Sequence, residues 1–134
     1  GIRHAEYNLE SEATTIFQIW IMPNRKGGSP SWGAKPFPKG NRSGAWQVLA
    51  SGMEGDTDAL PLRTNARVVG ATLKAGESLS YEVGTGRYAY LVPATGTVEI
   101  DGFRANARDG VAIKEGPITV TALEEAEIVL VDSQ

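Results

Sequence analysis

The sequence predicts an all-β protein folded as a barrel or a sandwich. Helical periodicity is almost absent over the 134 residues. Runs rich in β-branched and aromatic residues recur at short intervals instead. Glycine, proline and Asp-Gly pairs separate these runs, and short strands joined by such turns are typical of closed all-β folds.

Residues 14–22, TTIFQIWIM, are the first β-prone run, and Pro23 ends it. Apolar residues at both even and odd positions predict a strand that is buried on both faces. We expect this run to pair with a sheet of its own barrel or of a neighbouring molecule, because each large apolar side chain gains roughly 1.5–3 kcal/mol on burial. Residues 23–45 are rich in proline and glycine and predict an irregular connector.

Nine further strands are predicted after the connector. They cover residues 46–50, 60–62, 66–73, 78–83, 87–92, 97–101, 111–113, 117–122 and 126–132. The GTG stretch at 84–86 predicts a tight turn, and the Asp-Gly pairs at 101–102 and 109–110 predict further turns. Residues 123–126 are predicted to form at most one helical turn.

Alternation assigns side chains to the two faces of these strands. Val98 and Ile100 are expected to face the core, with Thr97 among the outward residues. Tyr88 and Tyr90 share one face, where they could line the barrel interior as a small-ligand pocket; packing is the favoured interpretation because side chains usually fill small barrels. The same choice, between lining a ligand slot and packing in the core, applies to three tryptophans, and core packing is again favoured. These are Trp20, Trp32 and Trp46.

Composition narrows the class of protein. No apolar run is long enough to span a bilayer. The absence of cysteine excludes disulfides and thiolate metal sites and fits the cytoplasm. The net charge is −3, with five bases and no acid in residues 23–46. Because no helix or aromatic-basic interleaving accompanies these bases, a solvated connector is favoured over a nucleic-acid surface. Neither a membrane nor a nucleic-acid partner is expected.

The chain opens with GIRHAEYN, which holds its single histidine. On a strand, His4 and Glu6 would point to the same face. An imidazole and a carboxylate together suit Fe(II), Ni(II), Cu(II) or Zn(II). The alternative is a disordered, solvated terminus in which the two residues are merely adjacent. Since no initiator methionine precedes Gly1, we expect the chain to be a piece of a longer protein.

Four stretches of the sequence resemble a known family. Residues 90–102, YLVPATGTVEIDG, resemble the centre of a cupin, a small jelly roll, and residues 1–8 fit the cupin motif G-x-x-H-x-x-x-N. The added glutamate two residues after the histidine is the mark of the pirin family. FQIWIMP at 17–23 and WQVLAS at 46–51 also resemble the bacterial pirins described as quercetin 2,3-dioxygenases. The resemblance runs nearly end to end.

The resemblance implies a division of the chain into three parts. Residues 1–22 would be remnant strands of a first cupin, 23–45 the connector, and 46–134 a complete C-terminal cupin. His4 and Glu6 would be the third and fourth ligands of a divalent metal, with Fe(II) favoured and Cu, Ni or Zn as alternatives. A His-x-His pair would lie upstream. Residues 81–89 contain no histidine where metal-binding cupins carry theirs, so the second cupin is expected to be metal-free.

The implied activity of the parent protein is ring-opening oxygenation of a flavonol by O2. Glu6 would act both as a ligand and as the acceptor of the flavonol proton. Without the upstream histidines, we expect this fragment to hold no metal and to be inactive. The alternative is a non-catalytic binding or regulatory module, the role described for eukaryotic pirins. Exchange of residues 14–22 between two copies predicts a homodimer.

Overall fold

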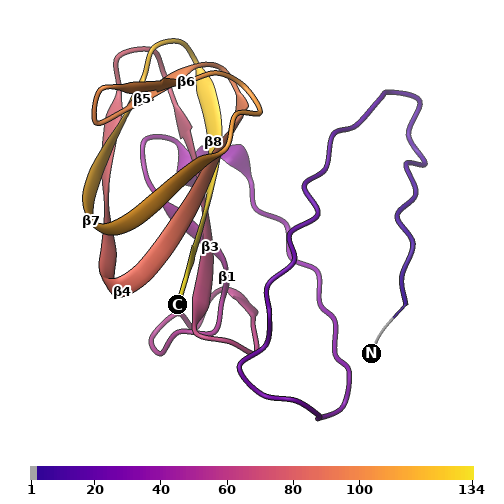
Figure 1. Ribbon diagram of the computed structural model, residues 1–134. Coiled ribbons are helices and arrows are strands. Elements are labelled where there is room, and N and C mark those ends of the chain that lie inside the picture. Colours follow the sequence, from indigo (N-terminus) through magenta and orange to yellow (C-terminus); the bar gives the residue numbers. More distant parts are fainter. Residues whose placement is uncertain (1–2) are drawn as a thin grey trace.

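The computed structural model describes residues 3–134, with the side chain of Asn41 left out of the description. Within that range it contains one short 3-10 helix and a single sheet of eight strands (Figure 1). The elements are η1 (Lys39–Arg42), β1 (Gln47–Ser51), β2 (Leu60–Pro61), β3 (Ala66–Leu73), β4 (Ser78–Thr95), β5 (Val98–Ile100), β6 (Phe103–Ala105), β7 (Val111–Ala122) and β8 (Ala126–Ser133). The predicted all-β class is confirmed.

The strand order is β2-β1-β3-β8-β4-β7-β5-β6, and two long strands turn this sheet into a barrel. The first half of β4 pairs with the second half of β7, from Ser78↔Thr121 to Val83↔Gly116. The second half of β4 pairs with β7 on one side and with β8 on the other. Figure 1 shows β4 and β7 curving around the barrel, so that each contributes to two of its walls.

The predicted tight turn at residues 84–86 is wrong, because β4 continues through it. Val83 pairs with Gly116 and Tyr88 with Lys114, so residues 84–87 of β4 stand opposite a single residue of β7. Extra residues on one strand bend it and increase its twist without reversing it. Gly86, with φ of 72°, accommodates this bend. The two strands predicted at 111–113 and 117–122 are likewise one strand, β7.

Alternation along the strands builds the core. In β8 the inward residues Ile128 and Leu130 are fully buried while their neighbours are half-exposed. Val98 and Ile100 are buried, as predicted. The Asp-Gly hairpin is also confirmed, with φ of 48° and 88° at residues 101 and 102. Thr97 is the exception, because it is buried and donates a 2.6 Å hydrogen bond to Glu124 Oε1.

Residues 123–126 form a bend before β8 and contain no helical turn. Leu123 N–H donates to Thr97 O at 2.9 Å and ties this bend to the start of β5. Among the described residues, no helix is both long and apolar enough to cross a membrane.

The strand predicted at residues 14–22 is not present in the structure, and its side chains lie largely in solvent. Trp20 is 87% exposed, and Ile16 and Met22 are also exposed. A strand needs the N–H and C=O groups of a partner strand. In residues 3–134, the first backbone hydrogen bond from this region to the barrel comes from Asn24 N–H to Arg63 O, at 3.1 Å. Figure 1 shows residues 3–22, here called the arm, extending away from the barrel.

The connector is irregular, as predicted, but several contacts hold it to the barrel. The Arg63 guanidinium donates to Ser29 O and to Ser31 Oγ. Lys35 forms an ion pair with Asp58 at 2.9 Å. Lys39 and Arg42 both pair with Glu127 on β8. The basic connector therefore lies against acidic residues of its own barrel, and the arm leaves from an anchored point near Asn24.

Candidate functional site

The arm brings the two predicted ligands together. His4 Nδ1 lies 3.0 Å from Glu6 Oε1, and both side chains are more than half exposed. The two groups are within hydrogen-bond distance of each other, so an imidazole nitrogen and a carboxylate oxygen lie side by side on the arm. In residues 3–134, no group of three or more His, Cys, Asp or Glu side chains is placed to hold an ion. Gly1, the first fixed residue of the motif, lies outside the described residues.

Asn8, the last fixed residue of the motif, organises the turn that follows. Its Oδ1 accepts a hydrogen bond from Glu10 N–H at 3.1 Å, and its Nδ2 donates to Glu12 O at 2.7 Å. An asparagine that bonds its own backbone two residues on is a common turn device. This turn was not predicted from the sequence, although the Asn-x-Glu spacing at residues 8–10 is compatible with it.

Strand β4 carries an ion-pair network inside the barrel. It includes residues 81–89, which were compared above with the metal-binding strand of cupins. Arg87 Nε donates to Asp132 Oδ1 at 2.7 Å, and both residues are buried. The Tyr81 hydroxyl donates to the other oxygen of Asp132 at 2.9 Å. Burial, followed by this bond to Asp132, raises the pKa of Tyr81 to about 12. The phenol therefore stays protonated and acts as a donor at neutral pH.

A second ion pair extends the network toward the loop after β1. Arg67 forms a bidentate ion pair with Asp56, with Nε···Oδ2 at 2.7 Å and Nη2···Oδ1 at 3.1 Å. The Ser51 hydroxyl also donates to Asp56, at 2.6 Å. The bond from Ser51, and then those from Arg67, hold the pKa of Asp56 below its usual value. The sequence pattern predicted neither pair, although Asp132 occupies an inward position of the alternating run AEIVLVD.

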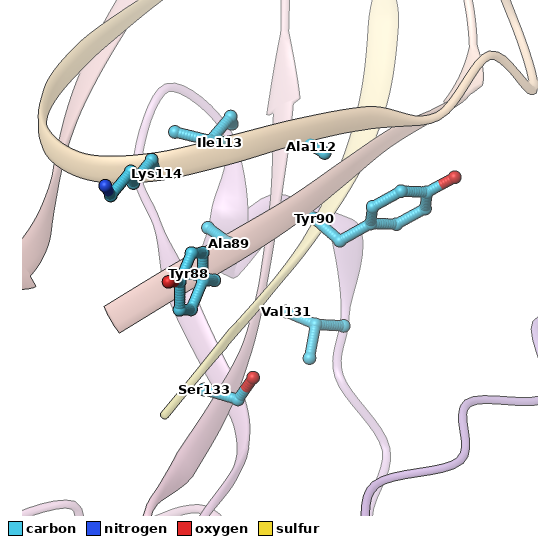
Figure 2. Close-up of a pocket in the computed structure, with 8 residues that line it drawn as sticks. All are labelled: Tyr88, Ala89, Tyr90, Ala112, Ile113, Lys114, Val131 and Ser133. Carbon is cyan, nitrogen blue, oxygen red and sulfur yellow. The ribbon is translucent and has the colours of Figure 1, made fainter. Parts of the chain in front are cut away.

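Tyr88 and Tyr90 point outward, so both interpretations that placed them in the barrel interior are wrong. They are 56% and 53% exposed. Figure 2 shows them on β4, above Val131 and Ser133 of β8. Together with Ala112 and Lys114 of β7, these residues line a shallow trough of about 370 Å³ on the outside of the sheet.

The three tryptophans differ in burial. Trp46 is half-buried, and its ring meets the Tyr81 ring edge-on at 5.6 Å, so its predicted packing is confirmed. Trp46 Nε1 also donates to Ser80 O at 2.9 Å. Trp20 and Trp32 are both exposed, and core packing is wrong for them in this chain.

Comparisons with known proteins agree with this architecture. Residues 48–133 match the family described as the quercetinase C-terminal cupin domain. A pirin-like protein of Caulobacter vibrioides is 66% identical over 134 residues, which are 99% of this chain and 58% of that protein. A quercetin 2,3-dioxygenase of Escherichia coli is 30% identical and matches 98% of this chain and 56% of its own length. The chain thus spans a little over half the length of these relatives.

Solved structures support the fold. The crystal structure of the bacterial pirin YhhW from Escherichia coli, in complex with nickel(II), superposes with a TM-score of 0.77. The superposition covers 85% of this chain and 48% of that protein, at 24% sequence identity.

Proposed function

The chain belongs to the pirin family, with residues 48–133 as its quercetinase C-terminal cupin domain, and from this membership we propose that it is the C-terminal part of a metal-dependent dioxygenase acting on a flavonol. Residues 1–22 would belong to the preceding cupin, and residues 46–134 would be the second cupin. The observation that carries the proposal is the convergence of His4 and Glu6 within 3.0 Å, in a motif that resembles the family's metal site.

Each of the two residues has a distinct proposed role. His4 holds the metal, and Glu6 holds it too while accepting the hydroxyl proton of the flavonol. A divalent metal, Fe(II) first among the candidates, supplies a Lewis acid and a template that orients the substrate. Asn8 stabilises the turn at residues 8–12, directly after the two ligands. With two of its ligands, the chain alone should bind the metal weakly and turn over no flavonol.

Metal binding by this pair can be tested without activity, because His4 is the single histidine of the chain. Titration with Ni(II) should broaden the imidazole proton resonances of His4 at submillimolar to millimolar metal. Glu6→Gln should weaken this effect about tenfold or more, because it removes a charged oxygen ligand. Glu12→Gln, another exposed acid of the arm, is the matched control and should leave the titration unchanged. Equal effects of the two substitutions would remove Glu6 from the site.

Catalysis is tested in a chain of the relatives' length. Residues 1–134 would replace the matching part of the Caulobacter pirin-like protein, and consumption of quercetin would be followed by absorbance with added Fe(II), Ni(II) or Cu(II). His4→Ala in this chimera should lower kcat about 100-fold or more. Removal of a residue that only hydrogen-bonds to a metal ligand already costs about 10–100-fold, and removal of a ligand itself should cost at least as much. Multiple turnovers by the 134-residue chain alone would contradict the proposed ligand set. An inactive chimera that still binds metal would favour the regulatory module.

We also propose that the isolated chain self-associates through the arm. Large apolar side chains of residues 14–22 are exposed, and burying each is worth roughly 1.5–3 kcal/mol. The arm leaves from the anchored contact of Asn24 with Arg63 and is free to reach a second copy. Exchange of an identical element is a low-cost route to a dimer.

The arm's role in association is measured by sedimentation. The wild-type chain should show a dimer at crystallisation concentrations, and a combined Ile19→Lys and Ile21→Lys variant should shift it toward the monomer. Ala34→Lys with Thr85→Lys adds the same charge at two exposed positions outside the arm and should leave the dimer intact. A monomer mass for the wild-type chain at high concentration would contradict self-association, and an unchanged dimer in the isoleucine variant would contradict the arm as its contact.

A further inference from the structure

The outer face of the sheet carries aromatic and apolar residues where a solvated face would carry polar ones. Tyr88 pairs with Lys114 on one side and Ser133 on the other, and Tyr90 pairs with Ala112 and Val131. These residues form two adjacent rows across β7, β4 and β8. Rows two residues apart are separated by roughly 6.6–6.8 Å along the strands. The trough therefore has an aromatic ring in each row, with Ala112 and Val131 beside one ring and Lys114 and Ser133 beside the other (Figure 2).

A glycine fixes one of the two rings. A Cβ atom built on Gly110 would lie 1.8 Å from Tyr90 Oη and 2.4 Å from Tyr90 Cζ. The end of the Tyr90 ring thus lies directly over the backbone of Gly110, where any other residue would displace it. Packing against the loop residue that precedes β7 holds this half-exposed ring in one position before any ligand arrives. Such preorganisation reduces the entropy lost on binding.

The charge at the trough is positive. Lys114 is exposed, and it makes no ion pair with another residue in the range 3–134. Ser133 adds a hydroxyl group at the same row. A volume of about 370 Å³ is ample for two fused aromatic rings. Tyrosine rings favour flat aromatic partners through stacked or edge-on contacts, and the ammonium favours an acidic substituent.

From these observations we propose that the trough over Tyr88 and Tyr90 is a binding site for flat aromatic anions, such as aromatic carboxylates or phenolates. The site lies on the barrel and uses no residue of the His4–Glu6 pair. It is therefore independent of the proposed dioxygenase activity, and either proposal can fail alone.

The test uses the 134-residue chain without metal and 2-naphthoate as the probe, with affinity measured by ligand-observed NMR. Tyr88→Leu and Tyr90→Leu keep an apolar side chain and should each weaken binding about fivefold. Phe103→Leu alters another exposed aromatic residue of the barrel, outside the trough, and should have no effect. Lys114→Gln should weaken 2-naphthoate about threefold and leave the uncharged 2-naphthalenemethanol unchanged.

Gly110→Ala tests the preorganisation directly. The three atoms nearest to the new methyl group all belong to the outer end of the Tyr90 side chain, so the ring should rotate away at little cost to folding. Affinity for 2-naphthoate should then fall to the level of Tyr90→Leu, with the thermal unfolding temperature nearly unchanged. Absence of naphthoate binding to the wild-type chain would overturn the site, as would equal losses in Phe103→Leu. If the tyrosine substitutions disperse a dimer and naphthoate does not bind, the face is an interface between copies and the proposal is wrong.

Discussion

Replacing Asp132 with asparagine is expected to lower the free energy of unfolding by about 3–5 kcal/mol, the usual cost of breaking a buried ion pair. The substitution leaves the Arg87 guanidinium buried without its counter-charge, and it weakens the bond from the Tyr81 hydroxyl. Side-chain exposure is only 9% for Arg87 and 4% for Asp132, so water cannot compensate the loss. Urea unfolding at neutral pH measures the difference.

Asp58→Asn is the matched control for this prediction. Asp58 also pairs with a basic residue, Lys35, but its side chain is 97% exposed. A solvated pair of this kind contributes about 1 kcal/mol or less. In a further variant, Arg87→Met with Asp132→Leu, both charges disappear, and this chain should be more stable than Asp132→Asn alone because no unpaired charge remains. Equal costs for Asp132→Asn and Asp58→Asn would show that burial of the pair does not govern its contribution.

Gly96→Ala is expected to destabilise the barrel by more than about 3 kcal/mol, from two combined causes. Gly96 has φ of 74°, a conformation that costs an L-residue about 1–2 kcal/mol. In addition, its Cβ would lie 2.3 Å from Glu125 O and 2.8 Å from Ala126 Cα. Both are backbone atoms at the start of β8, which is central to the sheet, so neither can move without displacing the strand. Thermal and urea unfolding measure the effect.

Gly102→Ala separates the two causes. Gly102 has φ of 88° in the β5–β6 hairpin, and a Cβ there would meet nothing within 4 Å. This variant should therefore lose only the conformational part, about 1–2 kcal/mol. If both variants lose the same free energy of unfolding, the close approach of residue 96 to the β8 backbone does not contribute to stability.

The sequence by itself determined the features that depend on a residue and its near neighbours. Apolar runs between turn residues identified β3 and β8, and alternation identified β5 with its inward side chains Val98 and Ile100. The Asp-Gly pair at 101–102 specified a hairpin because both residues adopt positive φ. The i, i+2 spacing of His4 and Glu6 predicted that the two side chains could meet, and they lie 3.0 Å apart.

The tertiary structure decided what depends on a partner strand. Whether the glycines at 84 and 86 reverse β4 or bend it was settled by the continuing register of β4 with β7. Tyr88 and Tyr90 keep the outward parity of Glu82 through this bend, because β4 continues in register with β7 and β8 and its odd-numbered residues on both sides of the bend face the core. The aliphatic run at 14–22 could not become a strand on apolarity alone, since a strand also requires the backbone groups of a neighbour. Asp132 and Arg87 are 45 residues apart in the chain, and the pairing of β4 with β8 brings their charges within 2.7 Å.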